Sequence, residues 1–130
     1  MRRLDDFETK AEAIDYIIWE KKLSRQQAEK YLIQHLPKES YYQTKIIQYL
    51  RSEYPNAFIW KAAAGPYSQS GIPDVCVIID GRFYGFEVKR PFIGKVSLIQ
   101  KDTIRKIRKA GGVADVVTRV RDVKRIIQEG

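Results

Sequence analysis

The stretch from residue 75 to residue 88 constrains the fold most strongly, because it has the form of a β-hairpin. Two runs rich in β-branched and aromatic residues, 75–79 and 82–88, flank the dipeptide Asp80-Gly81. This dipeptide suits the positive φ angles of a tight hairpin turn. Both runs are apolar enough to be buried on two faces, which is typical of strands in the middle of a sheet.

The turn sets the register of the hairpin. If Asp80-Gly81 forms the loop, Ile79 pairs with Arg82, and counting back along both strands places Asp74 opposite Glu87. A four-residue loop predicts the same pairing. Opposed residues point to one face with β-carbons about 5 Å apart, and Lys89 joins that face because side chains alternate along a strand. Two carboxylates and one ammonium group are therefore expected to converge.

Like charges directly opposite each other destabilise a sheet, so the pairing of Asp74 with Glu87 predicts a cation between them. Two carboxylates, with waters at about 2.1 Å, are typical ligands of Mg²⁺. A simpler interpretation is that Asp74 follows Pro73 in an ordinary turn and that Glu87 and Lys89 form a surface pair. The register and the apolar flanks favour the metal site.

The composition favours a polyanionic partner. The chain has 130 residues, 24 of them Lys or Arg and 16 Asp or Glu, for a net charge of +8. Such an excess of positive charge favours binding to nucleic acid. No apolar run approaches the roughly 18 residues of a membrane span, no secretory signal is recognisable, and Cys76 is the only cysteine. We expect a cytoplasmic protein of a bacterial or phage-infected cell, associated with the nucleoid.

Three amphipathic helices are predicted before the hairpin. Asp5 or Asp6 is expected to cap the first. Its apolar stripe consists of Phe7, Ala11, Ile14 and Ile18. Capping-box patterns that begin at Ser24 and at Ser40 predict the starts of the second and third helices, and Pro37 ends the second. The first two helices form an N-terminal arm, residues 1–38, for packing, dimerisation or DNA contact.

Further elements follow from the pattern of residues 39–130. A strand over 57–61 and a loop over 62–72 precede the hairpin, and a loop at 90–95 follows it. Ser97 caps a helix that ends at Gly111-Gly112, after which a strand at 113–117 leads into a last helix. The expected fold is an α/β domain with a mixed sheet flanked by helices and the hairpin near its centre.

The chain resembles the virus-type replication-repair nuclease (VRR-NUC) domains, a branch of the PD-(D/E)xK nucleases. The resemblance spans residues 41 to about 127 and rests on four ordered motifs. These are Gly71-Ile-Pro-Asp74, Glu87-Val-Lys89, Gln100, and Gly111-Gly112 before a strand. It implies a restriction-endonuclease-like fold with an N-terminal helical extension and Mg²⁺- or Mn²⁺-dependent cleavage of DNA. Stand-alone members resemble Holliday-junction resolvases that act as homodimers.

The resemblance also implies roles for individual residues. Asp74, Glu87 and the backbone carbonyl of Val88 would hold the metal. Lys89 would orient or deprotonate the attacking water, or stabilise the transition state as a cation. Gln100 would hold the site or a phosphate from its helix.

The sequence departs from the family pattern where the third helix begins. Members usually carry a glutamate near the start of that helix, and this chain has Tyr41 there. Gln43 is the first candidate for the missing ligand, although a capping role explains it equally well, and Glu39 is the second. Ser70 and Gly71 are expected to form a close approach of the backbone before the first carboxylate.

The predicted function is metal-dependent endonuclease activity on branched DNA. The alternatives are a DNA-binding or assembly module without catalysis, or a nuclease for linear, flap or single-stranded DNA. Cations on the helix after Ser97 form a row that suits a phosphate backbone. The expected DNA contacts are Lys61, Ser70, Arg90, Lys95, Lys101, Arg105 and Arg108.

Overall fold

The computed structural model describes residues 1–62 and 71–130. In chain order the elements are a 3-10 helix η1 (Leu4–Asp6), α1 (Lys10–Lys21), α2 (Arg25–His35), α3 (Glu39–Glu53), β1 (Phe58–Lys61), β2 (Val75–Ile79), β3 (Arg82–Val88), α4 (Leu98–Lys109), β4 (Val113–Val117) and α5 (Val120–Glu129). Apart from the short η1, this is the predicted order. No helix within the described residues has the length and apolar character needed to cross a membrane.

The four strands form one mixed sheet in the order β1-β2-β3-β4. β2 pairs antiparallel with both β1 and β3, and β4 pairs in parallel with β3. The central hairpin has the predicted turn, because Asp80 and Gly81 have φ angles of 49° and 81°. It also has the predicted register, with Ile79 paired to Arg82. The hairpin is confirmed as the centre of an α/β fold.

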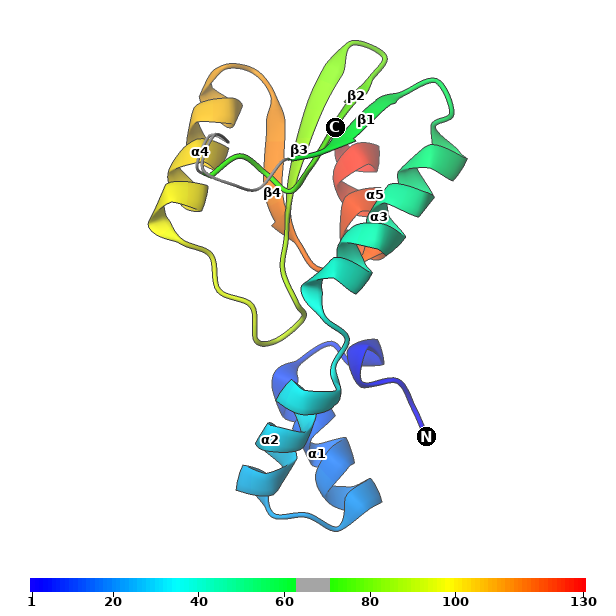
Figure 1. Ribbon diagram of the computed structural model, residues 1–130, viewed down its shortest axis with the longest axis vertical. Coiled ribbons are helices and arrows are strands. Elements are labelled where there is room, and N and C mark those ends of the chain that lie inside the picture. Colours follow the sequence, from blue (N-terminus) through cyan, green and yellow to red (C-terminus); the bar gives the residue numbers. More distant parts are fainter. Residues whose placement is uncertain (63–70) are drawn as a thin grey trace.

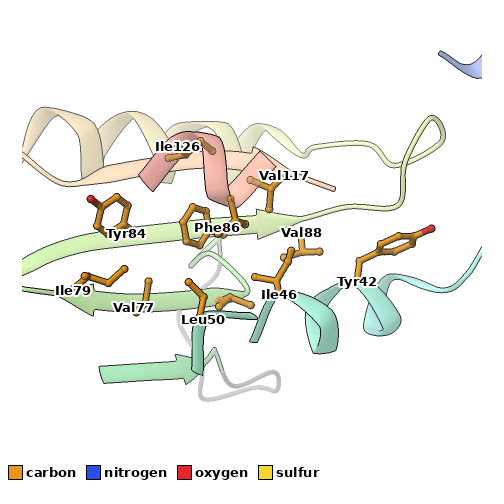
Figure 2. Packing of buried hydrophobic residues seen from close by; sticks show 12 residues of the cluster. Tyr42, Ile46, Leu50, Val77, Ile79, Tyr84, Phe86, Val88, Val117 and Ile126 are labelled. Carbon is orange, nitrogen blue, oxygen red and sulfur yellow. The ribbon is translucent and has the colours of Figure 1, made fainter. Parts of the chain in front are cut away.

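One face of the sheet forms the main core. The helices α3 and α5 lie against this face, and α4 lies on the opposite side of the sheet (Figure 1). Figure 2 shows Phe86 and Val88 of β3 facing Ile46 and Leu50 of α3. All four side chains are fully buried. Alternation along β3 then turns Glu87, between Phe86 and Val88, toward the face on the α4 side.

The helices α1 and α2 form a second, smaller core in an arm at the other end of the molecule from the hairpin turn (Figure 1). Ala13, Ile14 and Ile17 of α1 pack with Ala28 and Leu32 of α2, and all five are buried. The capping box predicted at the start of α2 is present, since Ser24 and Gln27 bond reciprocally.

The predicted starts of two helices are wrong. The helix α1 begins after Thr9, whose hydroxyl caps it, because the Asp5 carboxylate instead accepts hydrogen bonds from Arg3 and Tyr42. The buried stripe shifts with the start, so that Ala11 is exposed. The helix α3 begins at Glu39, which places Ser40 inside its first turn and not at the cap. Lys38 has the extended backbone of the N-cap position.

Candidate active site

Asp74 and Glu87, called the carboxylate pair below, lie side by side as the register predicts. Val75 pairs with Phe86. Asp74 and Glu87 are the next residues on the two antiparallel segments, and they therefore lie opposite each other. The backbone N–H of Val88 donates to Oδ2 of Asp74 at 2.8 Å, which fixes the aspartate beside β3. The Glu87 side chain is only 2% exposed, whereas Asp74 is partly exposed. A buried acid and a more accessible one thus meet at the end of the hairpin.

Burial and, after it, the charge of Asp74 raise the pKa of Glu87 to about 8. The nearby ammonium of Lys89 opposes this effect but does not cancel it. Burial disfavours the ionised carboxylate because the interior solvates charge poorly. The Glu87 carboxyl therefore favours its protonated form near neutral pH.

Lys89 lies on the same face as the carboxylate pair. Its Nζ is 3.6 Å from Oε1 of Glu87 and 4.0 Å from Oε1 of Glu39. The side chain is only 15% exposed. The backbone N–H of Lys89 donates to the carbonyl oxygen of Val117 at 2.9 Å, which extends the pairing between the chain after β3 and β4. The convergence of three charges expected from the sequence is present in the structure.

Gln100 connects the start of α4 to the site. Its Oε1 accepts from the backbone N–H of Ser97 at 2.9 Å, completing a capping box with that serine. Its Nε2 donates to Oε1 of Glu87 at 2.6 Å. One amide side chain therefore caps the helix and holds the buried carboxylate in place. This placement agrees with the expectation that Gln100 holds the site.

Glu39, the first residue of α3, also faces the carboxylate pair. Burial raises its pKa, and the charge of Asp74 raises it further, while Lys89 and Lys61 act in the opposite direction. Gln43, one turn later, is buried and donates from Nε2 to Oε2 of Glu39 at 3.5 Å. Of the two candidates on α3, Glu39 is the one whose carboxylate lies 4.0 Å from Nζ of Lys89, and Gln43 contacts Glu39.

The carboxylate pair supplies the candidate ligands for a metal. Within residues 1–62 and 71–130, no group of three or more His, Cys, Asp or Glu side chains is close enough together to hold a metal ion. Mg²⁺ commonly takes one or two protein carboxylates and keeps several waters. Two adjacent carboxylates, one of them buried with a raised pKa, fit such an ion, because a divalent cation offsets their repulsion.

Five of the residues predicted to contact DNA are exposed cations. Lys61, Lys95 and Lys101 are exposed. Arg105 and Arg108 are also exposed, but each is paired with an acid, Arg105 with Asp102 and Arg108 with Asp115. The remaining candidate on the loop before β2, Ser70, lies outside the described residues.

Arg90, another predicted DNA contact, binds the end of α2 in the structure. Its guanidinium donates to the carbonyl oxygens of Ile33, Leu36 and Pro37 at 2.7 to 2.9 Å. These carbonyls lie at and just beyond the end of α2, where four acceptors lack helical partners. Arg90 thus joins the arm to the chain that follows Lys89.

Gly71 makes the predicted close approach, and its substitution tests this contact. A β-carbon there would lie 2.6 Å from both Cγ2 of Ile99 and Oγ1 of Thr103 in α4. Gly71 also has a φ of +84°, a conformation that costs other residues about 1–2 kcal/mol. We expect Gly71→Ala to lower the free energy of unfolding by about 2 kcal/mol more than the control Gly81→Ala does.

Gly81 is a matched control because its φ is +81° and a β-carbon there would meet nothing within 4 Å. Urea unfolding of both variants separates the clash with α4 from the backbone strain that they share. Equal losses of stability would show that α4 does not pack closely on Gly71.

Two solved structures share this fold. One, described as a VRR_NUC domain, is 24% identical, and the match covers 65% of this chain and 92% of that one with a TM-score of 0.52. The other, a VRR_NUC domain protein, is 20% identical, with 72% and 87% of the two chains covered and a TM-score of 0.55. No family model matches the sequence, and no match is found among curated proteins. The chain therefore has the fold of VRR_NUC domains, as its motifs predict.

Proposed function

We propose that this protein is a metal-dependent endonuclease that hydrolyses phosphodiester bonds in DNA. The observation that carries the proposal is the convergence of the carboxylate pair with Lys89, whose Nζ is 3.6 Å from Oε1 of Glu87. A structural ion pair needs only one acid. A second acid beside it, at a cost in electrostatic repulsion, is typical of a site that binds a cation. The fold shared with VRR_NUC domains supports this interpretation.

The carboxylate pair and the backbone carbonyl of Val88 would hold Mg²⁺ or Mn²⁺. When bound, such an ion polarises a phosphoryl oxygen and makes water a better nucleophile. Oδ2 of Asp74 accepts from the N–H of Val88, and Oε1 of Glu87 accepts from Gln100. Both carboxylates are thus oriented in advance, which lowers the cost of organising the site.

The side chains around the pair would position the reactants. The ammonium of Lys89 would donate to the attacking water and to a phosphoryl oxygen that gains charge in the transition state. Glu39, 4.0 Å from that ammonium, would hold it over the scissile phosphate and accept a proton from the water. The water oxygen bonds to phosphorus as the bond from phosphorus to the leaving oxygen breaks, and the leaving oxygen takes up a proton.

Branched DNA is the proposed substrate, and a homodimer the proposed active form. A symmetric four-way junction needs two incisions, which a dimer with two-fold symmetry is suited to make. The net charge of +8 and the exposed Lys61, Lys95 and Lys101 favour a polyanion. Sedimentation that shows only a monomer at micromolar concentration would contradict the dimer without affecting the nuclease activity.

Cleavage assays on end-labelled DNA test the proposed function. The panel comprises a four-way junction, a flap, a linear duplex and a single strand, each with Mg²⁺, with Mn²⁺ and with EDTA. We expect cleavage with either metal, strongest on branched DNA, and none with EDTA. Binding that is insensitive to chelator and accompanied by no cleavage of any substrate would instead support the DNA-binding module.

A further inference from the structure

The face of the sheet that carries the carboxylate pair also carries three aromatic side chains, Phe58, Trp60 and Phe83, called the aromatic platform below. The pairing of the strands shows that they share this face. Trp60 pairs with Cys76, which lies two residues after Asp74 on β2 and therefore points to the same side. Phe58 alternates with Trp60 on β1, and Phe83 pairs with the residue two beyond Cys76.

The platform is continuous and open to solvent. The ring centroids of Phe58 and Trp60 are 5.4 Å apart, and those of Trp60 and Phe83 are 6.1 Å apart. Phe58 is 67% exposed and Trp60 is 36% exposed. The helix α4 packs on the β3 and β4 side of this face. Large exposed aromatic side chains grouped in this way are typical of a binding surface and not of a surface that only meets water.

The platform lies close to the carboxylate pair. Two residues of a strand span about 7 Å, and neighbouring strands are about 4.8 Å apart, so the Cα of Trp60 is about 8 Å from that of Asp74. This distance is about two steps of stacked bases at 3.4 Å each. Trp60 and the carboxylate pair thus lie within reach of one bound strand of DNA.

We propose that the aromatic platform stacks unpaired bases of the strand that is cut, so that the substrate is single-stranded for a few nucleotides beside the scissile phosphate. This inference rests on the proposed function. Bases in a duplex stack on one another, and only unpaired bases offer a face to a protein ring. The platform lies on the same face as the proposed metal site, and the net charge of +8 favours nucleic acid over a second, equally charged copy of this chain.

Binding to DNA without cleavage tests the platform. The probes are a fluorescein-labelled thymidine oligonucleotide of about 12 nucleotides and a blunt duplex of the same length, in EDTA. We expect the Phe58→Ala, Trp60→Ala double variant to bind the single strand about tenfold more weakly or worse, with little change for the duplex. Trp60→Phe should retain most of the affinity, because a phenyl ring still stacks.

Trp19 provides the matched control, since it is 73% exposed and lies on α1 in the arm. Trp19→Ala should bind the single strand like the unmodified protein. Circular dichroism checks that the double variant is folded. If that variant does not fold, Trp19→Phe leaves Trp60 as the only tryptophan, and its fluorescence should be quenched by the oligonucleotide.

The outcomes separate the platform from the nuclease activity. Unchanged single-strand affinity in the folded double variant, failure of the unmodified protein to bind the single strand, or no quenching of Trp60 would overturn the platform. Dissociation of an oligomer by Trp60→Ala, with affinity for DNA unchanged, would assign these rings to a second copy of the chain. Weakened single-strand binding in a protein that cleaves nothing with Mg²⁺ would support the platform while contradicting the nuclease.

Discussion

Asp74→Asn is expected to abolish DNA cleavage and at the same time to raise the stability of the metal-free protein. The amide keeps an oxygen that can accept from the N–H of Val88, so the local fold is retained. It loses the negative charge that a divalent cation requires. Because a bound metal contributes several kcal/mol to transition-state stabilisation, cleavage should fall about a thousandfold or more.

The gain in stability has a separate cause. The charge of Asp74 contributes to the raised pKa of Glu87, so removing that charge relieves the repulsion between them. Single-turnover cleavage measures the first effect, and thermal unfolding in EDTA near pH 8.5, where Glu87 is ionised, measures the second. Asp15→Asn, an exposed substitution in the arm, is the control and should change neither by much. An Asp74→Asn variant that cleaves normally would contradict the proposed site.

The second large effect is a dependence of stability on pH that metal reverses. Burial raises the pKa of Glu87 from 4.5 to about 8, so between these values the folded protein keeps a proton that the unfolded chain has lost. Stability therefore falls as pH rises through this window, because the folded state binds more protons than the unfolded state. In EDTA, we expect the unfolding temperature to decrease from about pH 5 to about pH 9.

Mg²⁺ should have the opposite dependence, because it needs the ionised carboxylate and competes with the proton. The rise in unfolding temperature on adding millimolar Mg²⁺ should be larger near pH 8.5 than near pH 6. Glu87→Gln is the control. The amide can still accept from Gln100, but it has no proton to lose and should weaken both trends. A Mg²⁺ effect that is equal at both pH values would show that Glu87 is not the group displaced by the metal.

The order of the elements and the hairpin were predictable because they depend on local rules. Positive φ angles at Asp80 and Gly81 and alternation along two apolar strands are enough to place Asp74, Glu87 and Lys89 on one face. A slip of one residue would turn all of these side chains to the other face. The cap of α4 is local in the same sense, since Ser97 and Gln100 lie three residues apart.

The contacts that the sequence did not predict involve distant partners. Asp5 is a residue type that often caps helices. Its carboxylate instead accepts hydrogen bonds from Tyr42 of α3 and the neighbouring Arg3, and α1 begins later. Arg90 has the charge of a DNA contact, but carbonyls at the end of α2, more than 50 residues earlier in the chain, accept its hydrogen bonds. A pattern in the sequence does not show which of several possible partners will be near.

The sequence alone determined the carboxylate pair and Lys89, because alternation and turn geometry act within one hairpin. The approach of Glu39 to Lys89 and the position of Trp60 on the same face of the sheet could not be read from the sequence. Both depend on how α3 and β1 dock against that hairpin. Docking depends on burial and packing summed over the whole core, and no short stretch of residues specifies that sum.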